Sequence, residues 1–348
     1  MDVPQHVVPY EGRQHEPVLV TEVVNWLRAS EGGLFVDCTV GMGGHAEAIL
    51  EASPQSRVIG LDRDMESLQL GTRRLERFGD RFIGNHANFK ELKPVLERHA
   101  IDQTAGILAD LGISSFQLAS EERGFSFQND APLDMRMDRS GGATAADLVN
   151  TLVESELADI IYKFGEERGA RRIARAIVRE RRRQPVTSTT QLAQVVVKAL
   201  NVPGRWRIHP ATRTFQALRI AVNCELEGLA EFVTVAACYL QPSGRLAIIS
   251  FHSLEDGIIK RAFRLAAGQC QCGARGRAPR HQDYMDPGGR QEEIPVSANR
   301  IDKVVCHHCG ARKLVEILTK KPIQPSQDEV RRNPRARSAR LRVCSRLH

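Results

Sequence analysis

Up to residue 110, apolar runs alternate with segments of helical periodicity. The apolar run at residues 34–37 leads into a loop and then into an alanine- and leucine-rich segment, which predicts a strand, a tight turn and a helix. Further apolar runs at residues 57–62, 81–86 and 105–110 are separated by segments with helical spacing. Because strands that alternate with helices form parallel sheets, we expect a doubly wound α/β core of the Rossmann type.

This alternation stops after residue 110. Residues 111–117 are expected to form a loop, and residues from about 143 to 205 have helical periodicity only. Strand character returns at residues 245–251, and alternation at 339–343 indicates a final strand. We therefore expect an all-helical domain inserted into the sheet domain. The expected limits are residues 15–134 for the first part of the core, 135–210 for the helical insertion, and 211–348 for the second part, with a cysteine-bearing insert at 268–312.

Glycines and acids cluster where the predicted strands end. Gly41, Gly43 and Gly44 follow the first strand, which ends in Asp37. This loop fits the dinucleotide-binding pattern, so a dinucleotide-dependent oxidoreductase is one alternative. A carboxylate at Asp37 would repel a pyrophosphate but would attract S-adenosylmethionine, which carries a sulfonium and an ammonium group. The acid that ends the next strand, Asp62, has the spacing for binding ribose hydroxyls in either class.

The charge distribution favours a polyanionic partner. The net charge is +7 and the isoelectric point is about 9.1. Residues 165–183 hold eight arginines and three glutamates around a narrow apolar stripe, and residues 331–346 hold seven arginines and no acid. Because exposed arginine binds phosphate well, we expect RNA contacts from these regions. The candidates are Arg171, Arg175, Arg179, Arg213, Arg335 and Arg337.

Neither a membrane segment nor an export signal is apparent. The N-terminal residues lack the basic start and apolar core of a signal peptide, and the sequence has no run of about 18 apolar residues. We therefore expect a cytoplasmic protein that does not enter a membrane.

Two close cysteine pairs near the C-terminal end form a candidate metal site. Cys270 and Cys272 are separated by 33 residues from Cys306 and Cys309. This arrangement is similar to the two halves of a zinc ribbon, although the first pair has one intervening residue in place of two. The segment between the pairs has few apolar residues to stabilise it. The sequence allows either a structural zinc ion or a surface insertion with reduced thiols.

Several blocks along the chain together indicate a known family. They are VGMGGH (40–45), LDRD (61–64), DLGISSFQ (110–117), RGFSF (123–127), PLDMRMD (132–138), YKFGEER (162–168), HPATRTFQ (209–216), ISFHSLED (249–256) and NPRARS (333–338). In this order, from about residue 15 to residue 342, they resemble the bacterial small-subunit (16S) ribosomal RNA cytosine-N4 methyltransferases, the RsmH or MraW family.

The resemblance implies an S-adenosylmethionine-dependent enzyme that methylates the N4 amine of a cytidine in the decoding centre. Its RNA partner would be 16S rRNA within an assembled or nearly assembled small ribosomal subunit. By matching motif positions, it places cofactor contacts on Gly43, Gly44, His45, Asp62, Phe89, Asp110 and Gln117. Asp37 joins this set through the charge argument alone.

The target amine sets a further requirement. Its lone pair is delocalised into the base, and a hydrogen-bond acceptor on its N–H groups would help to localise that pair. Asp110, at the end of the fourth strand, is the candidate catalytic residue. Phe116, Phe125 and Phe127 could stack on the base or pack in the core. The loop after Asp110 lacks the Asp/Asn-Pro-Pro-aromatic motif of many DNA amino methyltransferases, and a non-catalytic rRNA-binding assembly protein is a further alternative.

Overall fold

A computed structural model describes residues 17–120, 122–201, 208–269 and 312–347. Seven strands form one sheet in the order β3-β2-β1-β4-β5-β7-β6. The strands β1 to β5 are parallel to one another, whereas β7 is antiparallel to both β5 and β6. Their bounds are β1 Gly33–Asp37, β2 Ser56–Asp62, β3 Phe82–His86, β4 Thr104–Asp110, β5 Leu240–Ser250, β6 Val315–Ile317 and β7 Arg340–Arg346. The α/β sheet expected from the sequence is confirmed.

Helices cover both faces of this sheet, because the strands β1, β2, β4 and β5 bury apolar side chains on both sides. One face packs against α1 (Val20–Leu27), α2 (Gly44–Ala52) and α3 (Met65–Leu75). The other packs against α4 (Leu92–Arg98), α11 (Leu229–Tyr239) and α12 (Ser253–Ala266). The short elements η1 (Ala29–Glu31), η2 (Glu76–Arg81), η3 (Phe89–Glu91), α13 (Gln327–Arg332) and η4 (Pro334–Ser338) complete this part.

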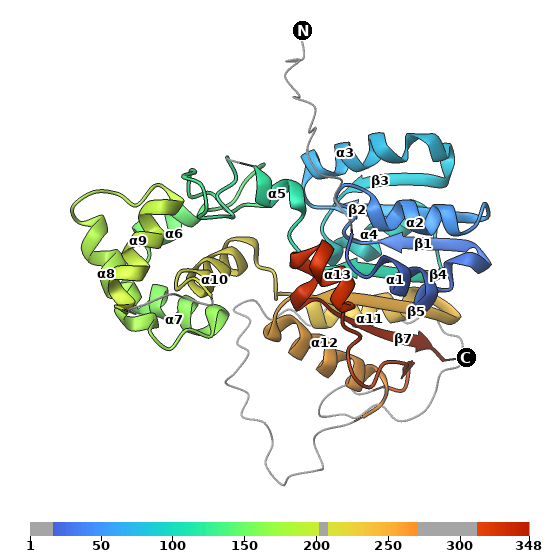
Figure 1. Ribbon diagram of the computed structural model, residues 1–348. Coiled ribbons are helices and arrows are strands. Elements are labelled where there is room, and N and C mark those ends of the chain that lie inside the picture. The colour runs from blue at the N-terminus through green and yellow to red at the C-terminus, as the bar shows by residue number, and fades with distance from the viewer. Residues whose placement is uncertain (1–16, 121, 202–207, 270–311, 348) are drawn as a thin grey trace.

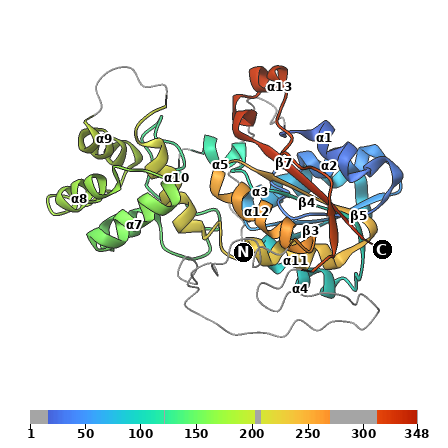
Figure 2. The same cartoon turned by 90° about the horizontal axis from the view of Figure 1, so that it is seen from below.

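A separate group of helices lies to one side of the sheet, as Figures 1 and 2 show. It comprises α6 (Ala145–Thr151), α7 (Glu154–Gly165), α8 (Ala170–Arg181), α9 (Thr189–Leu200) and α10 (Thr212–Asn223). These helices share an apolar core that extends from Phe125 to Leu218. Helix α10 thus packs with this group, although the expected insertion ended at residue 210. The exact domain limits remain a prediction.

Local signals in the sequence explain two further elements. The loop expected at residues 111–117 is in part a short helix, α5 (Ser115–Ala119), so that expectation was wrong there. Ser114 Oγ accepts a hydrogen bond from the Gln117 amide, and the Gln117 side chain accepts one from the Ser114 amide, which is a capping box. The expected final strand is confirmed as β7, where the Arg342 guanidinium binds buried Asp256. No helix in the described ranges is long and apolar enough to cross a bilayer.

Candidate functional site

The glycine loop between β1 and α2 requires its glycines. Gly41 and Gly43 have φ of 52° and 81°, in the left-handed region that side chains oppose. A Cβ on Gly44 would lie 2.7 Å from the Pro17 side chain, so Pro17 packs directly on the start of α2. The loop therefore presents bare backbone and the N-terminus of α2 at the carboxyl end of the sheet, where open α/β folds bind ligands.

Asp37 is a buried carboxylate below this loop. Its Oδ1 accepts a hydrogen bond of 3.0 Å from the Thr39 amide, whereas its Oδ2 has no hydrogen-bond partner among the described residues. Burial raises the pKa of Asp37 to about 6. A buried acceptor without a partner is costly unless a ligand supplies a donor or a cation. Asp37 therefore fits the positively charged cofactor that the sequence predicts.

Asp62 joins the end of β2 to the glycine loop. Its Oδ2 accepts a hydrogen bond of 2.6 Å from the Gly41 amide, and its Oδ1 accepts one of 2.8 Å from the Asp64 amide. Burial raises the pKa of Asp62 to about 7. Since each carboxylate oxygen has two lone pairs, these contacts leave capacity for ribose hydroxyls.

Asp110 lies beside Asp37 and His45. The Asp110 amide donates a hydrogen bond of 2.6 Å to Thr39 Oγ1, which joins the ends of β4 and β1. Asp110 Oδ1 accepts a weaker bond of 3.3 Å from the Gly112 amide, and Oδ2 lies 3.7 Å from His45 Nδ1. Burial raises the pKa of Asp110, while His45 opposes that shift. The structure thus brings Asp37, His45 and Asp110 together, as three of the predicted site residues.

Gln117 is held within the protein. Its Nε2 donates a hydrogen bond of 2.7 Å to Asp64 Oδ2, and its Oε1 receives the Ser114 amide. Asp64 also caps α3 and pairs with the guanidinium of Arg123, at 3.0 Å. The Arg123 side chain is only 1% exposed, and sequence reasoning missed its role. The arginine stands in an aromatic segment without periodicity, so the sequence carried no signal for its burial.

Of the four phenylalanines considered, two pack mainly into apolar cores. The Phe89 ring packs edge-on against Phe232, with centroids 5.2 Å apart, so its side chain contributes to the core of the sheet domain. Phe125 lies in the helical core. The Arg123 guanidinium lies 5.9 Å from the centroid of the Phe116 ring.

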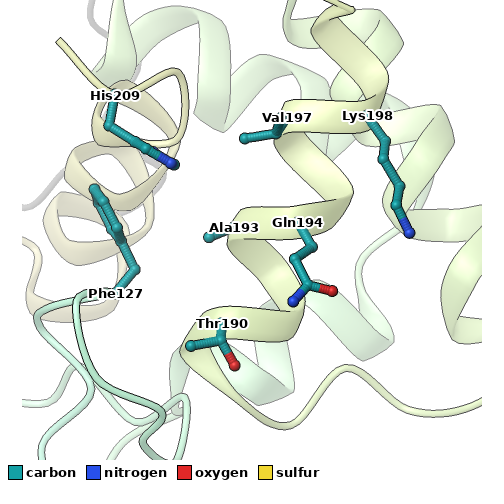
Figure 3. Close-up of a pocket in the computed structure, with 7 residues that line it drawn as sticks. All are labelled: Phe127, Thr190, Ala193, Gln194, Val197, Lys198 and His209. Carbon is teal, nitrogen blue, oxygen red and sulfur yellow. The ribbon is translucent and has the colours of Figure 1, made fainter. Parts of the chain in front are cut away.

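Phe127 lines a groove of about 350 Å³ in the helical part, and its ring centroid is 4.6 Å from that of His209. Figure 3 shows the two rings opposite helix α9. The remaining lining residues are Thr190, Ala193, Gln194, Val197 and Lys198.

The predicted RNA-binding arginines occupy two separate regions. Arg171, Arg175 and Arg179 are exposed on α8, at the outer end of the helical group in Figure 1. Arg175 lies 3.5 Å from Glu154, which leaves its side chain 75% exposed. Arg213 on α10 is also exposed and lies 3.7 Å from Glu167. The exposed arginines of the C-terminal region, Arg335 and Arg337, lie on η4 against the sheet domain.

A polar cluster next to Asp110 also has the composition of a metal site. It contains Glu225, His252 and Glu255. However, Arg219 binds both oxygens of Glu225, at 2.9 and 2.7 Å, and His252 Nδ1 accepts the Glu255 amide at the start of α12. Arg219 therefore pairs with Glu225 and His252 Nδ1 caps α12, while His252 Nε2 lies 3.1 Å from Glu255 Oε1. The predicted zinc ligands, Cys270, Cys272, Cys306 and Cys309, lie outside the described residues.

Comparison with known proteins agrees with this geometry. The strand order, with antiparallel β7 between β5 and β6, and the glycine loop with its acids define a Rossmann-like methyltransferase. The chain belongs to the MraW methylase family, whose model matches residues 12–286 and 292–347. This result rules out the dinucleotide-dependent oxidoreductase.

Two relatives share the name ribosomal RNA small subunit methyltransferase H. The relative from Syntrophotalea carbinolica is 47% identical over 338 residues, which cover 96% of this chain and 98% of that protein. The relative from Carboxydothermus hydrogenoformans is 43% identical over 333 residues, with the same coverage of 96% and 98%. Among solved structures, an rRNA methylase from Streptococcus thermophilus aligns with a TM-score of 0.36 and 9% identity, over 97% of this chain and 100% of that one.

Proposed function

We propose that this protein transfers a methyl group from S-adenosylmethionine to the N4 amine of a cytidine in the decoding centre of 16S rRNA. Membership of the MraW methylase family and the names of its relatives support rRNA methylation in the small subunit. The motif resemblance supports the cytidine and its N4 amine. The observation that carries the chemistry is the pair of carboxylates beside the glycine loop, Asp37, which is fully buried, and Asp110, whose side chain is 20% exposed.

The cofactor requires an environment of opposite charge, and this site provides one. S-adenosylmethionine, when bound, supplies an electrophilic methyl group on a sulfonium. The Oδ2 of Asp37, without a partner among the described residues, is a suitable acceptor for a cationic group. Gly43 caps α2 and its amide donates to the Val40 carbonyl, so the amides of Gly44 and His45 in the first turn are the donors offered to the cofactor. Asp62 would accept the ribose hydroxyls.

Gln117 and Phe89 have a supporting role in this proposal. The Gln117 amide fixes Asp64 at the start of α3, close behind Asp62. The Phe89 ring anchors the segment after β3 in the core, so its backbone is the part available to the cofactor.

Asp110 acts on the amine. Its carboxylate would accept an N–H hydrogen bond from the base and so favour the orientation in which the nitrogen lone pair faces the methyl group. After transfer the nitrogen must lose a proton, and a carboxylate whose pKa is raised by burial accepts a proton more readily than an exposed one. Asp110 therefore combines the orienting and the proton-accepting roles.

The arginines of α8, together with Arg213, Arg335 and Arg337, would bind phosphates of the rRNA. Their exposure and their positions at the outer end of the helical group and over the sheet domain suit an extended, folded RNA surface such as the small subunit.

Nucleoside mass spectrometry of small-subunit rRNA tests this function. Cells without the protein should lack one N4-methylated cytidine, and the wild-type gene should restore it. A gene with Asp110→Asn should not restore it, although the protein is made at a normal level. If Asp110→Asn or Asp62→Ala restored all functions of the gene, a non-catalytic assembly role would be favoured in place of methylation.

A further inference from the structure

His45 has a defined tautomer in this structure. Its Nε2 lies 2.8 Å from the carbonyl oxygen of Val18, which can only accept a hydrogen bond, so Nε2 carries the hydrogen. In a neutral ring the other nitrogen, Nδ1, then has a free lone pair. That nitrogen faces Asp110 Oδ2 at 3.7 Å, and the His45 side chain is only 6% exposed. The ring therefore presents a basic nitrogen to the carboxylate that handles the amine.

Charged groups surround the His45 ring and its partner Asp110. The ring belongs to the first turn of α2, at the positive end of that helix. Asp37 on β1 and Asp110 on β4 both interact with the ring, and Asp110 also interacts with Asp37 and with Glu255 on α12. The ring therefore lies between a helix N-terminus and two carboxylates.

We propose that His45 accepts, through Asp110, the proton that the methylated amine releases. This inference rests on the proposed function. His45 touches neither the base nor the methyl group in this scheme, so it is a positioning residue that acts through Asp110. The fixed Nε2 hydrogen gives the ring its orientation, and Nδ1 gives it the capacity to take the proton.

The atoms and charges balance as follows. The amine nitrogen forms a bond to the methyl carbon while the carbon–sulfur bond breaks, and the electron pair of that bond stays on sulfur. The nitrogen, now positively charged, gives one proton to the Asp110 carboxylate. Asp110 Oδ2, 3.7 Å from His45 Nδ1 in this structure, passes the proton to that nitrogen once the two groups close to hydrogen-bond distance in the complex, and becomes a carboxylate again. The imidazolium returns its proton to water after the products leave.

A structural role for His45 is the competing explanation, because the ring also ties Val18 to α2. His45→Gln separates the two roles. The glutamine side-chain amide can still donate to the Val18 carbonyl, but it has no basic nitrogen. His99→Gln is the matched control. His99 also uses its Nε2 for a hydrogen bond, to Asn85 Oδ1 at 3.0 Å. It lies near the edge of the sheet at which the strands begin, opposite the edge that carries Asp110.

The experiment combines rates, affinities and histidine NMR. The product of the wild-type protein is first identified by mass spectrometry, so a failure of the proposed function is seen before any variant is tested. His45→Gln should then bind S-adenosylmethionine within about threefold of the wild type, since the cofactor meets the backbone here. Its kcat at neutral pH should fall about 100-fold or more, the range for a lost acid–base group. His99→Gln should keep the wild-type kcat.

Two further readouts would not respond to a purely structural role. The kcat of His45→Gln should rise with pH, as water and hydroxide replace the histidine, and added imidazole should partly restore the kcat of His45→Ala. Nitrogen-15 spectra of labelled wild-type protein should show His45 with hydrogen on Nε2 only. Hydrogen on Nδ1, a wild-type kcat in His45→Gln, or parallel losses of kcat, cofactor affinity and melting temperature would overturn the proposal.

Discussion

Asp62 Oδ2 accepts a hydrogen bond of 2.6 Å from the Gly41 amide, so the end of β2 holds the glycine loop in place. Asp62→Ala should therefore remove both this bond and the proposed ribose contact. We expect S-adenosylmethionine binding to weaken by about 1.5–3 kcal/mol, as for hydrogen bonds to a charged group. Calorimetry measures this loss. The same measurement should detect no binding of NAD to the wild type or to the variant.

Asp80→Ala is the control for this experiment, because Asp80 is an exposed acid before β3 and far from the loop. An affinity of Asp62→Ala equal to that of the control would contradict the ribose assignment.

Asp110→Asn should separate catalysis from binding. The amide oxygen can still receive the Gly112 amide, so the loop should keep its shape, but the side chain can no longer take a proton. We expect kcat to fall by a larger factor than the affinity for the cofactor, as measured by single-turnover kinetics and calorimetry. Equal losses in both would assign Asp110 to the cofactor alone.

The arginines of α8 should make RNA binding depend on salt. Each phosphate contact contributes about 0.7–0.9 to the slope of log affinity against log salt concentration. Replacing Arg171, Arg175 and Arg179 by Gln should therefore flatten the slope by about 2 if all three bind phosphate. Fluorescence titrations of small-subunit RNA at several salt concentrations measure this change.

The matched control removes the same charge elsewhere. Arg57, Arg73 and Arg98 are exposed arginines of the sheet domain. Their replacement by Gln should lower the slope less than the α8 variant does. Identical slopes for the two triple variants would show that α8 has no particular role in RNA binding.

Burial of Asp37 should make the free protein less stable as pH rises. Its folded pKa of about 6 lies above the usual value of 3.8, so the folded state binds more protons between these values. The stability that Asp37 contributes is present below about pH 4 and is lost as pH rises through 6. The free energy of unfolding of Asp37→Asn, relative to that of the wild type, should therefore be higher at pH 8 than at pH 4, by on the order of 3 kcal/mol. Denaturant unfolding at the two pH values measures this gain.

Asp256 provides the opposite case. The Arg342 and Arg340 guanidinium groups hold the pKa of Asp256 below its usual value. Its contribution is present above the unfolded pKa and is lost only as pH falls through the lower folded pKa. Asp256→Asn should therefore destabilise the protein at both pH 4 and pH 8. If Asp37→Asn behaved in the same way, the burial argument for Asp37 would be wrong.

The cysteine pairs allow either a structural zinc ion or a surface insertion with reduced thiols, and a bound zinc ion makes the following prediction. Elemental analysis of protein purified without chelator should give about one zinc per chain, and Cys306→Ser combined with Cys309→Ser should remove it. Four thiolate ligands leave no open position for substrate, so the effect should be on stability more than on chemistry. Metal-free protein with normal activity and four freely titrating thiols would exclude the site.

The sequence predicted the strands better than the contacts of loop residues. Periodicity and terminal acids located β1, β2 and β4 with their aspartates at one edge, because these strands are apolar on both faces. The same reasoning could not tell that the Gln117 amide binds Asp64, or that Arg123 is buried. The direction in which a loop side chain points depends on partners far away in the sequence, and the hydrophobic pattern does not identify those partners.

Helix α10 illustrates the same limit. Its apolar residues Phe215 and Leu218 fit the helical core, while its last residue, Asn223, binds the backbone of Met135 and Met137. The helix thus belongs to the helical group, and its C-terminal end also holds the backbone of residues 135–137. A helix with contacts on several sides has no single apolar face from which its position could be predicted.

The position of β7 has a consequence for protein synthesis. Ser250 on β5 pairs with Arg340 on β7, 90 residues later in the chain. During translation the edge of β5 therefore stays open until β7 has left the ribosome, and Asp256 stays without Arg342 for the same time. A nascent or prematurely stopped chain presents an unpaired strand edge that can bind another strand. The edge of β5 is therefore covered, and the sheet complete, only when β7 has been synthesised and has paired with it.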